Sequence, residues 1–198
     1  ILENYGLYVS MQHVVKMILA IHMNDGNVKA WRDFDDDSQA SQYISCAVCV
    51  EDVLILAPFF AYDYHIYDIE SKDEIIFQKD YIAEKRFVGC PRIIISDGKG
   101  WGLPSIGDWV YRITLKGKTI SRCFNLRKEI RTQIGVDDQL ITLDKGYIWE
   151  DLLIFSLYAK GCICEYNVRN NDLQIYELSD IGFVQSVGIG NELYVVDR

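Results

Sequence analysis

The chain repeats the stretch Glu51–Phe77 (EDVLILAPFFAYDYHIYDIESKDEIIF) as Glu150–Tyr176 (EDLLIFSLYAKGCICEYNVRNNDLQIY), without a gap. Every position of the second stretch lies 99 residues after its counterpart in the first. Seven pairs are identical: Glu51/Glu150, Asp52/Asp151, Leu54/Leu153, Ile55/Ile154, Tyr67/Tyr166, Asp73/Asp172 and Ile76/Ile175. An internal match of this kind predicts a duplicated structural unit.

Turn signals divide the rest of the chain into similar modules. Asn24-Asp25-Gly26 lies between two apolar runs and predicts a hairpin, because the tight hairpin turns need residues that accept positive φ. Polar turns at 70–73, 116–118 and 169–172 separate further strand-like runs. We expect modules at residues 1–34, 43–77, 87–124, 139–178 and 183–198, the last of them incomplete.

Two stretches depart from this strand pattern. Asp97–Asp108 is predicted to be a long glycine-rich loop, and Phe124–Ile134 shows helical spacing that we interpret as a connecting loop or a single turn. The first strands of the third and fourth modules are expected at Phe87–Cys90 and Gln139–Leu143.

The period of the modules points to one architecture. Their second strands start near residues 6, 52, 92, 151 and 192, and four strands in each period of about 40–50 residues favour a β-propeller. The units Ile66–Phe77 and Glu165–Tyr176 resemble blades of the kelch, WD-type and quinoprotein-type propellers, members of the β-propeller repeat superfamily. The resemblance implies an all-β chain with about four and a half four-stranded blades in one propeller domain over residues 1–198, as part of a longer protein. A β-sandwich is the rival, but it does not explain the long ungapped repeat.

Bulk composition excludes several classes of partner. The net charge is −9, from 20 Lys and Arg against 29 Asp and Glu, so nucleic acid is disfavoured. No apolar run is long enough to span a bilayer, so no membrane insertion is expected. Six cysteines in apolar runs and the lack of an Asn-x-Ser/Thr sequon favour reduced thiols and a cytoplasmic location.

Candidate chemical motifs have structural explanations. Cys46 and Cys49 would point to opposite faces of a strand, and the Cys162/Cys164 pair lacks a zinc-site partner pair. His13, His22 and His65 stand near no nucleophile motif. The acidic run at Asp33 and Asp35–Asp37 could bind Ca²⁺ or supply carboxylates for glycoside chemistry, but such a run is more often a solvated loop. The sequence therefore predicts no catalytic residue, no metal site and no cofactor.

Aromatic residues in the predicted loops form the candidate binding surface. The propeller resemblance implies that loops between second and third strands, and loops between blades, emerge on one rim. Exposed aromatic side chains on such loops indicate recognition. The residues of this rim are Phe59, Phe60, Tyr62, Trp101, Tyr158, Lys160, Asp35, Asp36 and Asp37.

Three functions are compatible with this surface. The first is a non-catalytic binding or scaffold propeller that recognises a protein, peptide or glycan. The alternative is a carbohydrate-active propeller enzyme, similar to glycoside hydrolases, in which two Asp or Glu side chains converge at the central channel within about 5–10 Å. The third is a purely structural module of a larger polypeptide.

Overall fold

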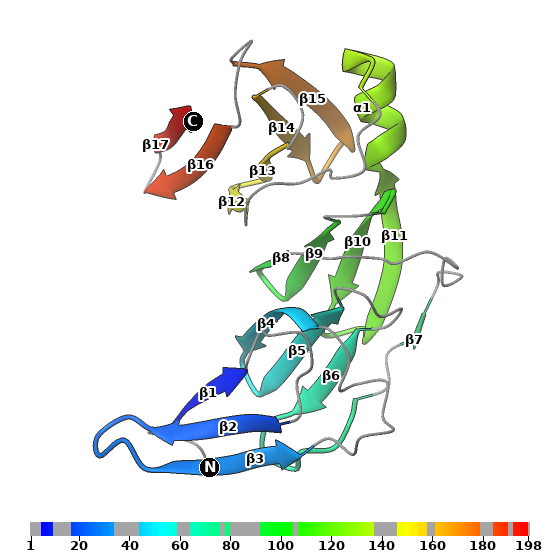
Figure 1. Ribbon diagram of the computed structural model, residues 1–198. Helices are drawn as coiled ribbons and strands as arrows, with labels where there is room; N and C mark the ends of the chain where they lie inside the picture. The colour runs from blue at the N-terminus through cyan, green and yellow to red at the C-terminus, as the bar shows by residue number, and fades with distance from the viewer. Residues whose placement is uncertain are drawn as a thin grey trace.

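Short strands joined by tight turns make up almost all of the described chain. The computed structural model describes residues 5–9, 17–33, 44–58, 64–75, 78–79, 92–104, 107–136, 146–157, 161–178, 184–189 and 192–197. These residues form five sheets that follow one another in chain order, from β1–β3 at the bottom of Figure 1 to β12–β17 at the top. Within the described residues, no helix is long and apolar enough to cross a membrane.

The second and fourth sheets contain the two repeated stretches. The second sheet consists of β4 (Ile44–Val50), β5 (Val53–Pro58) and β6 (His65–Asp68). The fourth consists of β12 (Tyr147–Trp149), β13 (Leu152–Ser156), β14 (Cys162–Asn167) and β15 (Asp172–Glu177). The expected first strand at Gln139–Leu143 lies outside the described residues, and β12 holds the first place.

The two sheets share one register. Leu54 lies opposite Tyr67 between β5 and β6, and Leu153 lies opposite Tyr166 between β13 and β14. Both tyrosines are buried. Tyr67 and Tyr166 thus occupy equivalent places in two sheets separated by a third, and the duplicated unit predicted from the repeat is confirmed.

The outer edge of the second sheet differs from that of the fourth. After β6 the chain makes a single antiparallel bridge between Tyr67 and Glu74. The next strand, β7 (Gln78–Lys79), then pairs in parallel with the outermost strand of the third sheet, Gln78 opposite Thr119. Consecutive residues thus contribute to two neighbouring sheets.

The third sheet corrects the predicted glycine-rich loop. It consists of β8 (Arg92–Ser96), β9 (Lys99–Leu103), β10 (Trp109–Thr114) and β11 (Thr119–Asn125), with β7 on its edge. The expected loop contains β9, because Asp97 and Gly98, at φ 50° and 70°, form a two-residue hairpin turn. The expected strand Phe87–Cys90 lies outside the described residues.

The one helix of the described residues corrects a second prediction. The stretch interpreted as a loop or one turn forms α1 (Leu126–Ile134). Asn125 caps its start by accepting a hydrogen bond from the Lys128 N–H, and Gly135 ends it at φ 70°. Leu126 and Ile130 are buried on one face of the helix, which fixes it to the outer side of the third and fourth sheets.

The terminal sheets contain fewer described strands. The first sheet has β1 (Tyr5–Val9), β2 (Met17–His22) and β3 (Val28–Asp33), and β2 and β3 form the hairpin predicted from Asp25-Gly26. The fifth has β16 (Val184–Ile189) and β17 (Glu192–Asp197).

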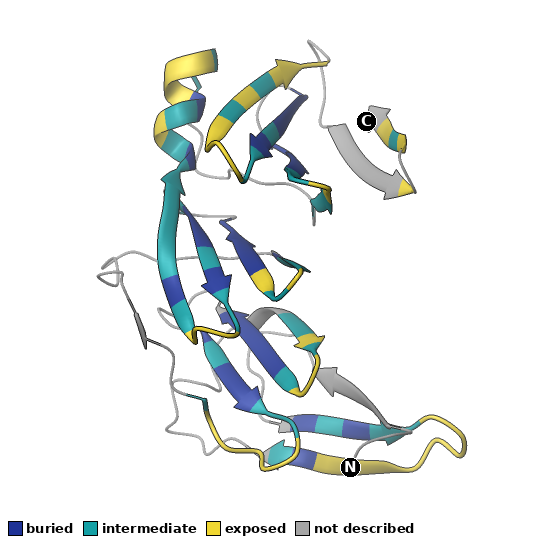
Figure 2. Ribbon diagram, turned by 180° about the vertical axis from the view of Figure 1, so that it is seen from behind, coloured by how far each residue is buried: buried dark blue, intermediate teal, exposed yellow. Residues whose placement is uncertain are grey.

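The core lies between neighbouring sheets rather than at one centre. One cluster joins the first and second sheets, one the second and third, and one the third, fourth and α1. Figure 2 shows these buried segments along successive strands. The first strands β4, β8 and β12 also contact one another in turn, so the sheets converge on their inner strands.

Candidate functional site

Tight turns at the ends of the inner strands give three sheets the same exposed feature. Each turn has two residues, and its first residue is a carboxylic acid with φ between 50° and 52°. A two-residue hairpin of this twist requires positive φ, which fixes the direction of the acidic side chain. The three turns, called here the turn face, are Glu51-Asp52, Asp97-Gly98 and Glu150-Asp151.

A second set of turns supports the turn face. In each sheet, the residue that follows the third strand donates its N–H to the carbonyl of the second turn-face residue. The pairs are Ile69 to Asp52 at 2.8 Å, Leu115 to Gly98 at 3.1 Å and Val168 to Asp151 at 2.8 Å. The inner turns are therefore held rigidly by their own sheets.

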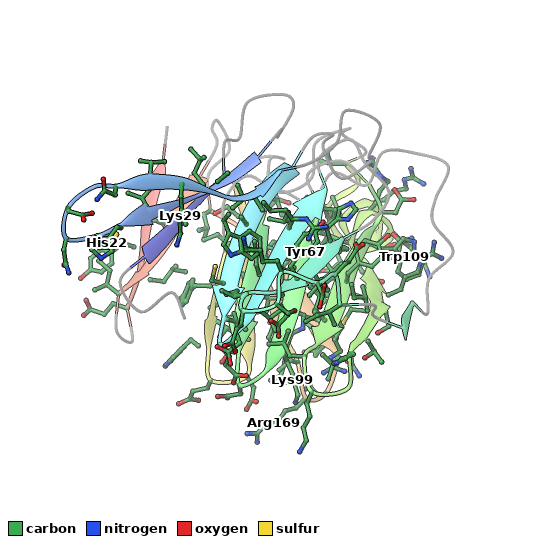
Figure 3. All side chains as sticks on the ribbon, turned by 90° about the horizontal axis from the view of Figure 1, so that it is seen from below. His22, Lys29, Tyr67, Lys99, Trp109 and Arg169 are labelled. Carbon is green, nitrogen blue, oxygen red and sulfur yellow. The ribbon has the colours of Figure 1, made fainter. Side chains whose placement is uncertain are left out.

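Exposed charges of both signs lie at this end of the molecule. The side chains of Glu51, Asp97 and Glu150 are exposed on the inner turns. The outer turns carry cations, of which Arg169 pairs with Asp151 at 2.7 Å. Figure 3 shows Lys99 and Arg169 together at this end of the strands. The inner turns thus expose carboxylates, with cations such as Lys99 and Arg169 at the same end.

Hydrogen bonds also fix the outer turn of the second sheet. Asp68 Oδ1 accepts the N–H groups of Ser71 at 2.7 Å and Glu70 at 3.0 Å. These bonds, that from Ser71 first, lower the pKa of Asp68 below its ordinary value. Asn167 accepts equivalent bonds from Arg169 and Asn170 in the fourth sheet.

Trp149 adds an aromatic surface to the turn face. It is the last residue of β12, directly before Glu150, and 41% of it is exposed. It lies opposite Leu152, on the side of the sheet that faces β16 and β17. An exposed indole beside carboxylates can bind an apolar group or a cation through its ring.

The predicted rim residue Trp101 is buried, so its assignment to an exposed loop was wrong. It lies in β9 with 2% of its surface exposed and packs with Leu153 and Phe155 between the third and fourth sheets. Its position corresponds to Ile55, because both are the third residue after the tight turn. Its Nε1 has no hydrogen-bond partner among the described residues.

The other predicted rim residues lie outside the described residues, so their arrangement stays a prediction. They are Phe59, Phe60, Tyr62, Tyr158, Lys160, Asp35, Asp36 and Asp37. The structure therefore brings none of the predicted rim residues together in its described part.

Histidines and cysteines take part in local contacts. His22 Nδ1 lies 2.6 Å from Asp25, and His65 Nδ1 lies 3.1 Å from Glu74. Cys164 is fully buried, and desolvation raises the pKa of its thiol. The described part of the chain holds no group of three or more His, Cys, Asp or Glu side chains that could hold a metal ion.

Sequence reasoning missed Trp149 and the turn-face acids, although the repeat contained the signal. The paired stretches begin with Glu51-Asp52 and Glu150-Asp151, which we used to align the units and not as candidate site residues. Trp149 directly precedes the second pair. Its exposure depends on tertiary packing, which the local sequence does not encode.

Comparison with known proteins shows the fold. No protein-family model and no curated protein sequence matches this chain. Its structure is similar to the β-propeller domain of Cps50 (Swd1) from Myceliophteria thermophila, with a TM-score of 0.65, 12% identity and 98% of this chain covered. The chain has a β-propeller fold.

Two further structures support this assignment. A chain of the Mitotic Checkpoint Complex matches 98% of this chain with a TM-score of 0.62 at 12% identity. U3-55K matches 91% with a TM-score of 0.59 at 11% identity. This propeller chain spans 59% of the Cps50 chain, 57% of the checkpoint chain and 52% of U3-55K.

Proposed function

We propose that this chain is a non-catalytic binding propeller that recognises a protein or peptide through its turn face. The observation that carries the proposal is Trp149, an exposed aromatic residue at the end of an inner strand. Large aromatic side chains supply much of the binding energy in protein interfaces when they are presented on a rigid scaffold. The hydrogen-bonded turns beside Trp149 supply that rigidity.

The charge of the surface suggests the character of the ligand. Glu51, Asp97 and Glu150 are exposed on the turn face, and the whole chain carries a net charge of −9. Complementary charge speeds association and discriminates against wrong partners. A ligand with Lys or Arg side chains is therefore favoured, with a cation placed over the Trp149 ring.

The aromatic loop residues remain a second predicted contact surface. Phe59, Phe60, Tyr62, Tyr158 and Lys160 belong to connections between second and third strands. These connections leave the sheets at the end opposite the tight turns.

Peptide selection tests the proposal. A random-peptide phage library is selected on the immobilised 198-residue chain, and enriched peptides are synthesised and titrated by calorimetry. We expect enrichment of Lys and Arg, and a Kd at least about tenfold weaker for Trp149→Ala, the size of effect of an interface anchor. Tyr176→Ala is the matched control, because Tyr176 is an equally exposed aromatic residue on the outer strand of the same sheet.

Other outcomes would overturn the proposal. Selection without enrichment, or equal affinity of the Trp149→Ala variant, excludes the turn face as the peptide site. Binding to a glycan array in place of peptides would assign the glycan class of ligand. Hydrolysis of aryl glycosides that is lost in Glu51→Gln or Glu150→Gln would establish the carbohydrate-active alternative.

A further inference from the structure

The third sheet and the helix that follows it carry charge of the opposite sign to the rest of the chain. Residues 92–136 contain nine Lys and Arg against three Asp and Glu, a net charge of +6, although the whole chain has a net charge of −9. The remaining residues therefore hold 11 basic against 26 acidic side chains. A local excess of one sign on a protein of the other sign can steer and select a charged partner.

Two consecutive residues, Asp108 and Trp109, hold two of these cations at the start of β10. Asp108 Oδ1 accepts a hydrogen bond from Arg127 Nε at 2.7 Å, and the Asp108 carbonyl accepts the Arg127 N–H. The Arg122 guanidinium lies over the Trp109 ring, 4.8 Å from its centroid. A cation that is already held by a carboxylate or an aromatic ring loses little conformational freedom when it binds a ligand. Arg122 and Arg127 are therefore preorganised for an anion.

Helix α1 extends this basic surface. Residues three and four apart lie on one face of a helix, so Arg131 shares a face with Arg127 and Lys128. Lys128 and Arg131 are exposed, whereas Leu126 and Ile130 are buried. The basic face of the helix therefore points away from the core that holds α1 to the sheets.

Two lysines continue the surface at the other end of β11. Lys116 and Lys118 are exposed on the turn between β10 and β11. From this turn β11 runs directly into α1 on the outer side of the third sheet (Figure 1). Its 7 residues span about 23 Å at the usual rise of a strand. The residues of this surface, called here the basic edge, are Lys116, Lys118, Arg122, Arg127, Lys128 and Arg131.

We propose that the basic edge binds an acidic peptide segment, rich in Asp and Glu, of another protein. An extended segment of about ten residues would reach from Lys118 to the helix at about 3.3 Å per residue. A long polyanion such as nucleic acid fits less well, because beyond this edge it would meet the acidic remainder of the chain. The neighbouring sheets pack on the two faces of the third sheet and not on its outer edge, so the stack itself leaves this surface accessible.

The basic edge and the turn face favour ligands of opposite charge. The turn face exposes Glu51, Asp97 and Glu150 on inner turns, whereas the basic edge follows the strand β11 and α1. The ligand proposed for the turn face carries Lys or Arg, which the basic edge repels. The two proposals can therefore fail separately, since each is tested with its own probe and its own variants.

A labelled acidic peptide tests the proposal. A fluorescein-labelled peptide of about ten alternating Glu and Ser residues is titrated with the 198-residue chain and followed by fluorescence anisotropy. We expect saturable binding that weakens as NaCl is raised from about 50 to about 200 mM, because salt screens exposed ion pairs. Lys128→Glu combined with Arg131→Glu should weaken binding about tenfold, since two attractions become repulsions. Both residues are exposed, so the core beneath α1 keeps its packing.

A matched charge reversal and a second probe complete the test. Lys29→Glu combined with Lys99→Glu makes the same change in net charge at exposed positions that Figure 3 shows apart from Trp109, and should change the peptide affinity by less than about twofold. Equal weakening by both double variants, or no binding by the unchanged chain, would overturn the proposal. Tighter binding of a ten-nucleotide oligothymidine would assign nucleic acid to this edge in place of a peptide. Dimerisation of the unchanged chain that is lost on reversal of Lys128 and Arg131 would assign a second copy.

Discussion

Tyr166 joins the third and fourth sheets through its hydroxyl group, which donates to Asn171 Oδ1 at 2.6 Å and lies 3.4 Å from Cys123 Sγ. Tyr166→Phe should lower the free energy of unfolding by about 0.5–1.5 kcal/mol, because a partly buried hydrogen bond between the sheets is lost. Urea titration followed by circular dichroism measures it. Tyr176→Phe is the control, since that hydroxyl donates to Gln174 on an exposed strand, and should change stability by less than about 0.5 kcal/mol. Equal losses of unfolding free energy in the two variants would contradict a role for the Tyr166 hydroxyl in joining the third and fourth sheets.

Tyr67 makes stability depend on alkaline pH. Desolvation raises the pKa of Tyr67 to about 12, with Glu74 acting in the same direction and Arg32 against it. The folded state therefore holds this proton more tightly than the unfolded state, in which tyrosine titrates near 10. The resulting stability is fully present below about pH 10 and is lost as pH rises toward about 12.

Replacement of Tyr67 checks this linkage. Urea midpoints measured at a series of pH values should fall between about pH 10 and 12 in the unchanged chain, and should fall less steeply in Tyr67→Phe. The variant is compared with itself at pH 8 to remove the loss of packing. If the urea midpoint fell with pH equally steeply in both proteins, groups other than Tyr67 would cause the loss of stability at alkaline pH.

Trp101 shows why single residues were hard to place from the sequence. Its neighbours Gly98, Gly100 and Gly102 suggested a flexible loop. The structure uses Gly100 in a strand, where an added Cβ would lie 3.3 Å from Ile113 Cβ. Glycine here allows close packing of the sheet. Exposure of the indole could not follow from the local sequence, because burial depends on the fourth sheet.

At the scale of elements, the repeat predicted most strands and missed those whose composition departed from it. The registers of β5–β6 and β13–β14 follow from the matched apolar positions. β9 was not predicted because Gly100 and Gly102 stand where the strands of the repeated units have leucine or phenylalanine. The Asp97-Gly98 pair was nevertheless the same hairpin signal that correctly placed β2 and β3.

Helix α1 depends on its first capping residue. Asn125→Ala removes the side-chain oxygen that accepts the Lys128 N–H at 2.8 Å, and should lower the free energy of unfolding by about 1 kcal/mol. Chemical denaturation measures the loss. Asn125→Asp keeps the acceptor and should retain most of the stability. The same loss of stability in both variants would show that Asn125 acts through another contact.

The capping signal at Asn125 and Gly135 was present in the sequence. The helix was missed because its apolar periodicity is short.

At the scale of the whole molecule, position in the stack should determine local stability. The second, third and fourth sheets each have a packed neighbour on both sides, whereas the described first and fifth sheets have one. In repeat architectures stability is close to a sum of such neighbour terms. We expect amides of β5, β10 and β13 to exchange hydrogen only on global unfolding, and those of β2 and β17 to exchange by local opening.

Native-state hydrogen exchange at increasing denaturant separates these two regimes. Exchange in the terminal sheets should be independent of denaturant at low concentration. Uniform exchange across all five sheets would mean that the stack unfolds as one cooperative unit.

The parallel strand β7 has a mechanical consequence. The chain that leaves the second sheet after Glu74 is hydrogen-bonded to β11 of the third sheet, so these two sheets share a backbone strap at their outer edges. Helix α1 acts in the same way one junction further, where Gln133 Nε2 donates to the Leu173 carbonyl at 3.2 Å. Hinge motion between the three middle sheets would have to break these straps. Bending of the molecule under load should therefore occur between the first and second sheets and between the fourth and fifth sheets. The three middle sheets should move together as one rigid body.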